Sequence, residues 1–419
     1  MALPRVYNPA PFRPSSIMLR PSSLAITALL TALVALGPIS TDLYLPSLPG
    51  LLRHFNADVA EVQLTLSVFL IGLAVGQLAY GPLSDRYGRR PVLLGGVFLY
   101  VVASIACALA PSIPALIAAR LFQALGACAG PVICRAIVRD VHGREGAARI
   151  LSYMSAAMAL APALGPILGG YVEAWLGWRA NFAILCIYGA GGLALALAML
   201  PETAPHRGEG GPWLDAALRG YLSLFRQRIY IGFVLCCSLA YGGIFCFISG
   251  SSFVFVDIIG LPPERYGLCF AAIVLGYIAG TLAGGRLTRR FGIERMVATG
   301  GLISALGGVA LIVSVMTFGA TVPGILAPTI VYMIGTGLVM PNAMAGAIGP
   351  FARIAGTAAA LLGFVQMGLA ALGGALIGHL ANGTAIPMAA GIALVGAFQP
   401  LVYRLFISGA ASPGSAAAR

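Results

Sequence analysis

The sequence predicts an all-α polytopic membrane protein made of two similar halves. It is 59% hydrophobic and only 9% charged, whereas soluble domains carry about a quarter charged residues. Apolar runs recur at the length of about 20 residues that crosses a bilayer. A basic turn between two such runs returns in weakened form 204 residues later, with Arg289 at the place of Asp85. Composition therefore excludes a soluble fold, and the repeat indicates a duplicated membrane unit.

Twelve membrane-spanning helices are expected, six on each side of a polar break. The first six are predicted at residues 24–45, 62–82, 91–110, 114–138, 147–172 and 179–200, and the second six at 229–256, 266–285, 295–318, 321–349, 355–380 and 386–407. The chain then divides into an N-terminal segment (1–23), a six-helix bundle (24–200), a central loop (201–228), a second six-helix bundle (229–407) and a tail (408–419). No cleaved signal peptide is predicted, and either Met1 or Met18 fits as the first residue.

The basic residues set the orientation of these helices. All 25 of them are arginines. With a cytoplasmic N-terminus, 21 lie on the cytoplasmic side, while Arg53, Arg179 and Arg265 lie outside and Arg120 lies within a span. Because arginines collect in cytoplasmic loops, both termini and the central loop are predicted to be cytoplasmic.

Several functional classes are excluded or disfavoured. A net charge of +12 would suggest a nucleic-acid partner in a soluble protein, but here the arginines are explained by topology. The absence of lysine excludes a phosphate-binding P-loop and Schiff-base chemistry. The eight cysteines lie in or beside apolar runs without metal-ligand spacing. We expect no enzyme activity, metal, cofactor or nucleic-acid partner.

Three motifs resemble the major facilitator superfamily over nearly the whole chain. The first is the turn at 81–90, which reads Gly-x-Leu-x-Asp-Arg-x-Gly-Arg-Arg, and the second is the Gly-Pro-x-x-Gly-Gly stretch at 165–170, which is similar to that superfamily's antiporter motif. The third, at 120–126, resembles its drug:proton antiporter branch. The stretch at 41–49 is similar to the Bcr/CflA family, associated with bicyclomycin, chloramphenicol and multidrug export, and 341–343 and 355–360 support the same placement.

The resemblance implies a major facilitator fold and proton-coupled efflux of drugs or other small amphipathic compounds by alternating access. The expected place is the bacterial inner membrane, with the proton gradient as the only energy source and a monomer as the working unit. The alternative is proton-coupled uptake or export of a small metabolite on the same fold. The Gly-Pro motif disfavours a symporter, and no catalytic constellation supports a membrane enzyme.

Asp42 and Arg120 are the predicted proton-coupling pair. Each is an ionisable group at membrane depth, which is costly and therefore a functional candidate. A buried guanidinium needs an acceptor, which Asp42, the Gln123 amide or backbone carbonyls could supply. The alternatives are a helix-end aspartate that meets water and an arginine that snorkels to the interface.

The turn at 81–90 and the end of the fourth helix form a predicted cytoplasmic latch. The resemblance implies that Asp85 faces the start of the eleventh helix near Gly356 and that Arg89 pairs with Asp140. The alternative is that these charges only fix topology. The latch residues are Gly81, Asp85, Arg86, Gly88, Arg89, Arg90 and Asp140.

Two further groups complete the predicted site. Gly165, Pro166, Gly169 and Gly170 are expected to kink the fifth helix and pack it against the opposite half, although ordinary small-residue packing is the alternative. Residues that could line a drug cavity are Tyr44, Gln123, Asn342 and Gln366. Asp257 is interpreted as a helix-end residue that caps or meets water.

Overall fold

The computed structural model describes residues 23–158, 161–203 and 213–408, and none of these lies in a β-strand. The first half contains α1 (Leu24–Val34), α2 (Leu36–Asp42), η1 (Leu45–Ser47), α3 (Leu48–Phe55), α4 (Val59–Tyr87), α5 (Arg89–Ala108), α6 (Ile113–Met158), α7 (Ala161–Leu176) and α8 (Trp178–Met199). The second half contains α10 (Arg228–Ser252), η2 (Phe253–Ile258), α11 (Pro263–Phe291), α12 (Ile293–Phe318), α13 (Val322–Ile348), η3 (Gly349–Ile354), α14 (Ala355–His379), α15 (Ile386–Val402) and η4 (Tyr403–Ile407). The predicted all-α class is confirmed.

Ten of the described helices are long and apolar enough to cross a membrane, or eleven if the bent first segment is one span. That segment joins α1 to residues 36–55 through a bend of 43°. Pro38 lies just after the interruption at Ala35 and lacks the N–H that a continuous helix would use. The span predicted at 147–172 includes residues 159–160, which lie outside the described residues, between the last described residue of α6 and the first of α7. The count of twelve therefore stays a prediction.

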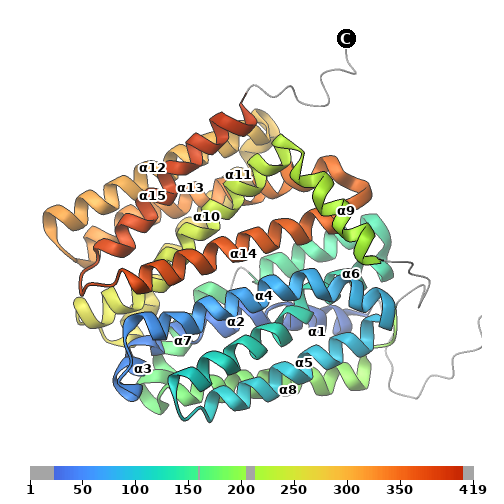
Figure 1. Ribbon diagram of the computed structural model, residues 1–419, viewed down its shortest axis with the longest axis horizontal. Helices are drawn as coiled ribbons and strands as arrows, with labels where there is room; N and C mark the ends of the chain where they lie inside the picture. The colour runs from blue at the N-terminus through green and yellow to red at the C-terminus, as the bar shows by residue number, and fades with distance from the viewer. Residues whose placement is uncertain (1–22, 159–160, 204–212, 409–419) are drawn as a thin grey trace, which may run out of the picture.

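The two halves lie side by side, with α4 and α14 adjacent at their boundary (Figure 1). A second boundary contact joins α7 to α11. Antiparallel α4 and α14 meet where Gly363 faces Gln77 and where Gly378 faces Gln63. These four helices form most of the boundary between the halves.

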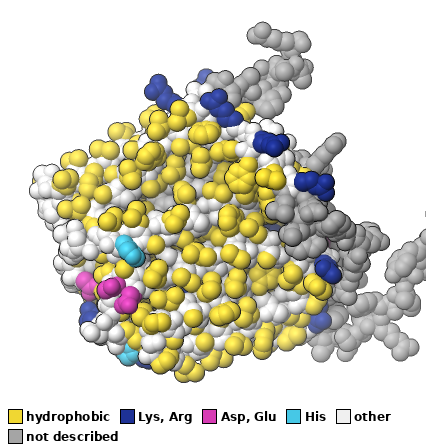
Figure 2. Space-filling view, viewed as in Figure 1, with side chains coloured by type: hydrophobic (Ala, Val, Ile, Leu, Met, Phe, Trp, Pro, Cys, Tyr) yellow, Lys and Arg dark blue, Asp and Glu magenta, His cyan; other side chains and the backbone are white. Residues whose placement is uncertain are grey.

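The described chain begins and ends at one end of the bundle. The end of α8 meets the turn at 81–90, where the Arg90 guanidinium donates to the Leu197 carbonyl. The start of α10 meets η4, where Arg228 donates to the Leu405 carbonyl. Figure 2 shows arginines along the side where α9 and the C-terminus lie, and a broad hydrophobic surface beside them. We call this side the arginine-rich end, and its place on the cytoplasmic side stays a prediction from the positive-inside rule.

The predicted central loop contains one helix, α9 (Trp213–Phe225), that hydropathy did not indicate. Leu224 is fully buried, and Gly220 packs against Thr357 at the start of α14. This helix therefore packs against the second half.

The two copies of the basic turn share one backbone geometry. Gly88 ends α4 with φ 101°, and Gly292 ends α11 with φ 81°. Both values lie in the left-handed region that side chains rarely adopt, which explains why glycine stands at both places. The repeat seen in the sequence is thus a repeat of structure.

Candidate functional site

Arg120 of α6 is fully buried in the first half. Its Nη1 donates to the Gln123 Oε1 at 2.7 Å and to the Ser40 carbonyl at 3.1 Å. Gln123 lies one turn along the same helix, so helical spacing brings it to Arg120. Two of the acceptors expected from the sequence, an amide and a backbone carbonyl, therefore hold this guanidinium.

Aromatic rings surround the Arg120 guanidinium. Its carbon lies 4.1 Å from the centre of the Phe69 ring, 4.8 Å from Tyr44 and 5.8 Å from Phe182. A cation over an aromatic face is attracted by the ring quadrupole, by about 2 kcal/mol or more when water is excluded. Its Nε and Nη2 are buried without a hydrogen-bond partner in the described part of the chain. The interpretation that Arg120 snorkels to the interface does not fit this environment.

Hydrogen bonds continue from Gln123 into the third predicted span. The Gln123 Nε2 donates to the Ser104 Oγ at 2.9 Å, and this hydroxyl donates to the Tyr100 carbonyl at 2.7 Å. The Tyr100 hydroxyl lies 2.7 Å from the Ser40 Oγ. The network thus returns to the helix that ends at Asp42, and it fixes Arg120 from three helices.

Asp42 is the last residue of α2 and is 4% exposed. No hydrogen bond or ion pair to its carboxylate occurs among the described residues, and Arg120 contacts the backbone two residues earlier instead. Tyr241 and Tyr266 of the second half lie within electrostatic reach of the carboxylate. Asp42 is therefore a buried acid near the boundary between the halves.

The Gly-Pro motif of α7 packs against both halves. A Cβ at Gly165 would lie 2.7 Å from the Cβ of Asp42, and one at Gly169 would collide with the Leu43 carbonyl. On the opposite side, Gly170 meets the Pro263 carbonyl, and Gly267 meets the Pro166 carbonyl. Only glycine allows this approach of α7 to α2 and α11.

Polar contacts join the halves at the end opposite to the arginine-rich end. Arg53 of α3 pairs with Asp257 of η2 at 3.4 Å, and Gln63 donates to the Ser249 carbonyl. The interpretation of Asp257 as only a helix-end residue is incomplete, because this carboxylate binds across the boundary. Arg53 and Asp257 are 204 residues apart, the same separation as the two basic turns.

Glu173 is a residue of this end that sequence reasoning missed. It lies two turns beyond Gly165 on α7 and accepts a hydrogen bond from the Ser47 Oγ at 2.5 Å. Ser47 also accepts from the Asn181 amide at 2.8 Å. The signal in the sequence was the spacing of 165, 169 and 173, which places all three on one face of a helix.

At the arginine-rich end three of the predicted latch residues, Asp85, Arg89 and Asp140, form one cluster within the first half. Arg89 Nε donates to Asp140 at 3.0 Å, its Nη1 lies 2.5 Å from Asp85, and the Glu202 carboxylate accepts from the Arg89 backbone N–H at 3.0 Å. Arg86 lies over the Tyr87 ring at 5.3 Å. The Asp85 side chain is 65% exposed, and the described contacts give it no hydrogen bond to α14. A Cβ at Gly81 or at Gly356 would meet open space.

The four residues considered for a drug cavity lie in separate places. Tyr44 and Gln123 are fully buried around Arg120. Asn342 accepts from the Thr288 hydroxyl at 2.7 Å near the arginine-rich end, and Gln366 of α14 is 7% exposed. They do not form one lining in this conformation.

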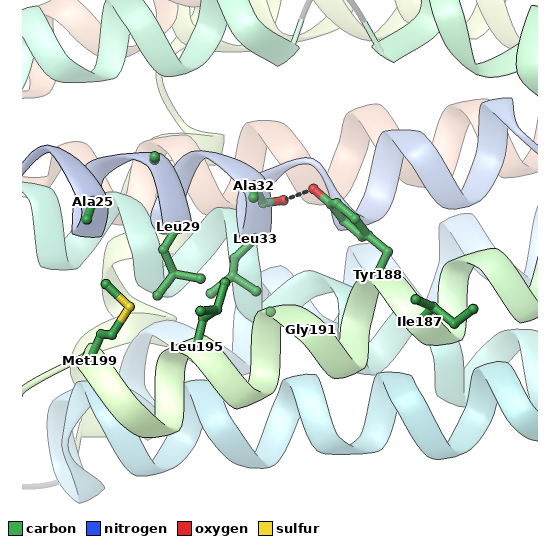
Figure 3. Close-up of a pocket in the computed structure, with 11 residues that line it drawn as sticks. Ala25, Leu29, Ala32, Leu33, Ile187, Tyr188, Gly191, Leu195 and Met199 are labelled. Carbon is green, nitrogen blue, oxygen red and sulfur yellow. Dashed lines mark hydrogen bonds between the residues drawn. The ribbon is translucent and has the colours of Figure 1, made fainter. Parts of the chain in front are cut away.

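An apolar groove of 570 Å³ lies between α1 and α8. Leu29, Leu33, Leu195 and Met199 line it, and the Tyr188 hydroxyl donates to the Ala32 carbonyl at 2.6 Å beside them (Figure 3). No charged side chain of the described residues lines this groove. It is separate from Arg120 and from the contacts between the halves.

A family model and curated relatives both match most of this chain. The family model of the Major Facilitator Superfamily matches residues 29–375. A chloramphenicol resistance protein of Pseudomonas aeruginosa is 34% identical, with 87% of each chain covered. A bicyclomycin resistance protein homolog of Haemophilus influenzae is 29% identical, covering 84% of this chain and 88% of that one. Both relatives are matched over most of their length.

Solved structures give the same fold. The xylose transporter XylE of Escherichia coli superposes with a TM-score of 0.72 at 16% identity, over 91% of this chain and 97% of that one. A bacterial homolog of the human lysosomal transporter Spinster also gives a TM-score of 0.72 at 16% identity, over 94% and 100% of the two chains. At this identity the likeness concerns the fold.

Proposed function

Because the chain belongs to the major facilitator superfamily and is a membrane transporter rather than an enzyme, we propose that it exports drugs or similar small amphipathic compounds in exchange for protons. The relatives named for resistance to chloramphenicol and bicyclomycin support the export of such compounds. Their bacterial origin supports a place in the inner membrane. The two-halved fold supports alternating access.

The observation that carries proton coupling is the isolation of Asp42. A carboxylate that is 4% exposed and has no cation partner among the described residues is costly to keep ionised, because a charge loses its hydration on burial. Protonation removes that cost in the conformation described here. When the halves move and water reaches Asp42, the ionised form becomes stable again. The occupancy of this one proton thereby biases the two conformations.

The contacts between the halves support an inward-facing conformation. The Arg53–Asp257 pair and the Gln63–Ser249 contact close the end away from the arginines. At the arginine-rich end, Arg89 pairs with acids of its own half. In this arrangement a compound from the cytoplasm would enter between the halves and leave after the outer contacts break.

The proton gradient supplies enough free energy for such a cycle. One proton crossing 100 mV gains about 2.3 kcal/mol, and a pH gradient adds about 1.4 kcal/mol per unit. Since each 1.4 kcal/mol is a factor of ten in concentration, one proton per cycle with a pH gradient of about one unit supports a drug gradient of roughly a few hundredfold.

Drug susceptibility of a pump-deficient bacterial strain tests the proposal. Expression of the chain should protect the strain from chloramphenicol or bicyclomycin, and Asp42→Asn at equal membrane abundance should not. In inverted vesicles, adding the drug should release protons with the parent chain and not with the variant. A variant that protects as well as the parent would contradict the role of Asp42.

A second result would overturn drug export itself. If the parent chain protects against neither compound while counterflow of a metabolite occurs in everted vesicles, the metabolite transporter considered from the sequence is the better description. Proton release with that metabolite would keep the role of Asp42 and change only the substrate.

A further inference from the structure

The second copy of the basic turn, at residues 285–295, carries an unneutralised basic surface. Its four arginines are Arg286, Arg289, Arg290 and Arg295, and all four are exposed. None of them has an ion pair among the residues that the structure describes. The one acidic residue of this turn is Glu294, which lies near Tyr403 of η4. We call these four arginines the second-turn patch.

The first copy of the turn neutralises one of its arginines, Arg89, with acids of the chain, while Arg86 is exposed over the Tyr87 ring as Arg290 is over Phe291. Arg89 has only 12% of its side chain exposed because Asp85 and Asp140 pair with it. In the second copy, Arg289 stands at the place of Asp85, and Ile293 stands at the place of Arg89. The network of ion pairs has therefore been replaced by free positive charge.

The rest of the second half has no acid to offer this patch. Glu294 is the last acidic residue of the sequence. The other two acids of the second half, Asp257 and Glu264, lie at the opposite end of α10 and α11. An anion that neutralises the patch must then come from outside the second half.

Apolar side chains between the arginines indicate where that anion lies. Leu287 is 40% exposed and Phe291 is 39% exposed, and the Arg290 guanidinium lies over the Phe291 ring at 5.3 Å. Farther from the turn, Leu282 on α11 and Leu302 on α12 are 57% and 56% exposed. Along this surface, exposed arginines are thus followed by exposed leucines. This order matches the headgroup region and the hydrocarbon core of a bilayer.

We propose that the second-turn patch binds the phosphate headgroup of an anionic phospholipid in the cytoplasmic leaflet. Guanidinium groups bind phosphate oxygens in pairs, with a geometry that matches the anion. The acyl chains would lie along the exposed leucines of α11 and α12. A soluble phosphate would use the arginines but would leave Leu287 and Phe291 in water, so the lipid fits the whole surface. The proposal does not depend on what the transporter exports.

Lipid binding to the full chain in detergent tests the proposal. The probes are short-chain phosphatidylglycerol, phosphatidylcholine with the same acyl chains, and inorganic phosphate, each titrated by microscale thermophoresis. Phosphatidylglycerol should bind at least tenfold more tightly than the other two. Arg289→Gln/Arg290→Gln should weaken its binding by roughly tenfold or more, since each arginine near an anionic surface contributes about 1 kcal/mol.

A matched variant removes two exposed arginines elsewhere at the same end. Arg139→Gln/Arg226→Gln loses the same charge and should change phosphatidylglycerol binding by less than about threefold, because these arginines lie outside the patch. Equal losses in both variants would mean nonspecific attraction by net charge and would overturn the proposal. Equal binding of inorganic phosphate would overturn the choice of a lipid.

The parent chain supplies a measurement that needs no variant. Binding of phosphatidylglycerol should weaken as salt rises from about 50 to 500 mM, because screening shortens the range of the arginine charges. If the affinity for phosphatidylglycerol does not change with salt concentration, the acyl chains alone hold the lipid. This result would also overturn the proposal.

Discussion

The two halves share one helix-packing scheme but differ in what they bury at its centre. Gly126 of α6 packs against Gly96 and Tyr100, and Gly335 of α13 packs in the same way against Gly300 and Ser304. Six residues before each glycine stands a fully buried polar residue, Arg120 in the first half and Thr329 in the second. One place in the duplicated unit thus holds a cation in one copy and a hydroxyl in the other.

The difference between Arg120 and Thr329 shows that equivalent places in a duplicated fold can hold residues of different charge and different hydrogen bonding. Thr329 satisfies itself by donating to the Ile325 carbonyl on its own helix, and the buried polar neighbours in the second half, such as Tyr332 and Gln399, are uncharged. Arg120 instead depends on a second residue and on another helix. Among the described residues, buried charge is therefore concentrated in the first half, at Asp42 and Arg120, and the buried polar residues of the second half are neutral.

The largest effect is expected from removing the buried cation. Arg120→Met leaves the Gln123 amide oxygen and the Ser40 carbonyl without their donor, at about 1–3 kcal/mol for each group. We expect drug transport to fall by roughly a hundredfold, measured as drug-dependent proton release in inverted vesicles. Thr329→Val, at the equivalent place, should stay within about twofold of the parent. Similar losses in both variants would break the comparison of the halves.

A smaller loss is expected where the halves touch through glycine. Gly170→Ala directs a methyl group at the Pro263 carbonyl across the boundary, 2.5 Å away, and such overpacking costs about 1–3 kcal/mol. Transport should fall about tenfold, and the melting temperature of the protein in detergent should decrease. Gly285→Ala, where a Cβ meets nothing within 4 Å, is the control. An unchanged Gly170→Ala variant would mean that this contact does not close the boundary.

Hydropathy and the repeated turn were enough to predict the all-α class and the duplication, because both depend on chain-local patterns. The neighbours of Arg120 were only partly predictable. Gln123 follows from helical spacing on the same helix, but the Ser40 carbonyl and the Phe69 ring come from other helices. Glu173 was missed, although its spacing from Gly165 and Gly169 places it on the same helix face. Its partner Ser47 lies 126 residues away in the chain, and the spacing does not predict that partner.

The basic turns allow a third, weaker test of asymmetry. Arg89 binds Asp85, Asp140 and Ser84, so Arg89→Gln removes the centre of the cluster. Transport should slow by roughly three- to tenfold with drug binding nearly unchanged, because the latch acts on movement rather than on the drug. Ile293→Gln, at the equivalent place in the second half, should leave the rate within about twofold. Stopped-flow proton release and equilibrium drug binding measure the two quantities, and lost binding with an unchanged rate would contradict a latch.

The smallest effect is expected at the ion pair between Arg53 and Asp257, which joins equivalent places of the two halves. Arg53 is 70% exposed and Asp257 is 32% exposed, and such pairs contribute about 0–1 kcal/mol. Arg53→Asp or Asp257→Arg alone places like charges together and should favour opening at this end, changing the rate by up to about fivefold. The double exchange Arg53→Asp/Asp257→Arg restores the attraction and should recover the parent rate. If the double variant is as impaired as the single variants, then Arg53 acts through the nearby Glu173 within its own half, and the pair does not close the boundary between the halves.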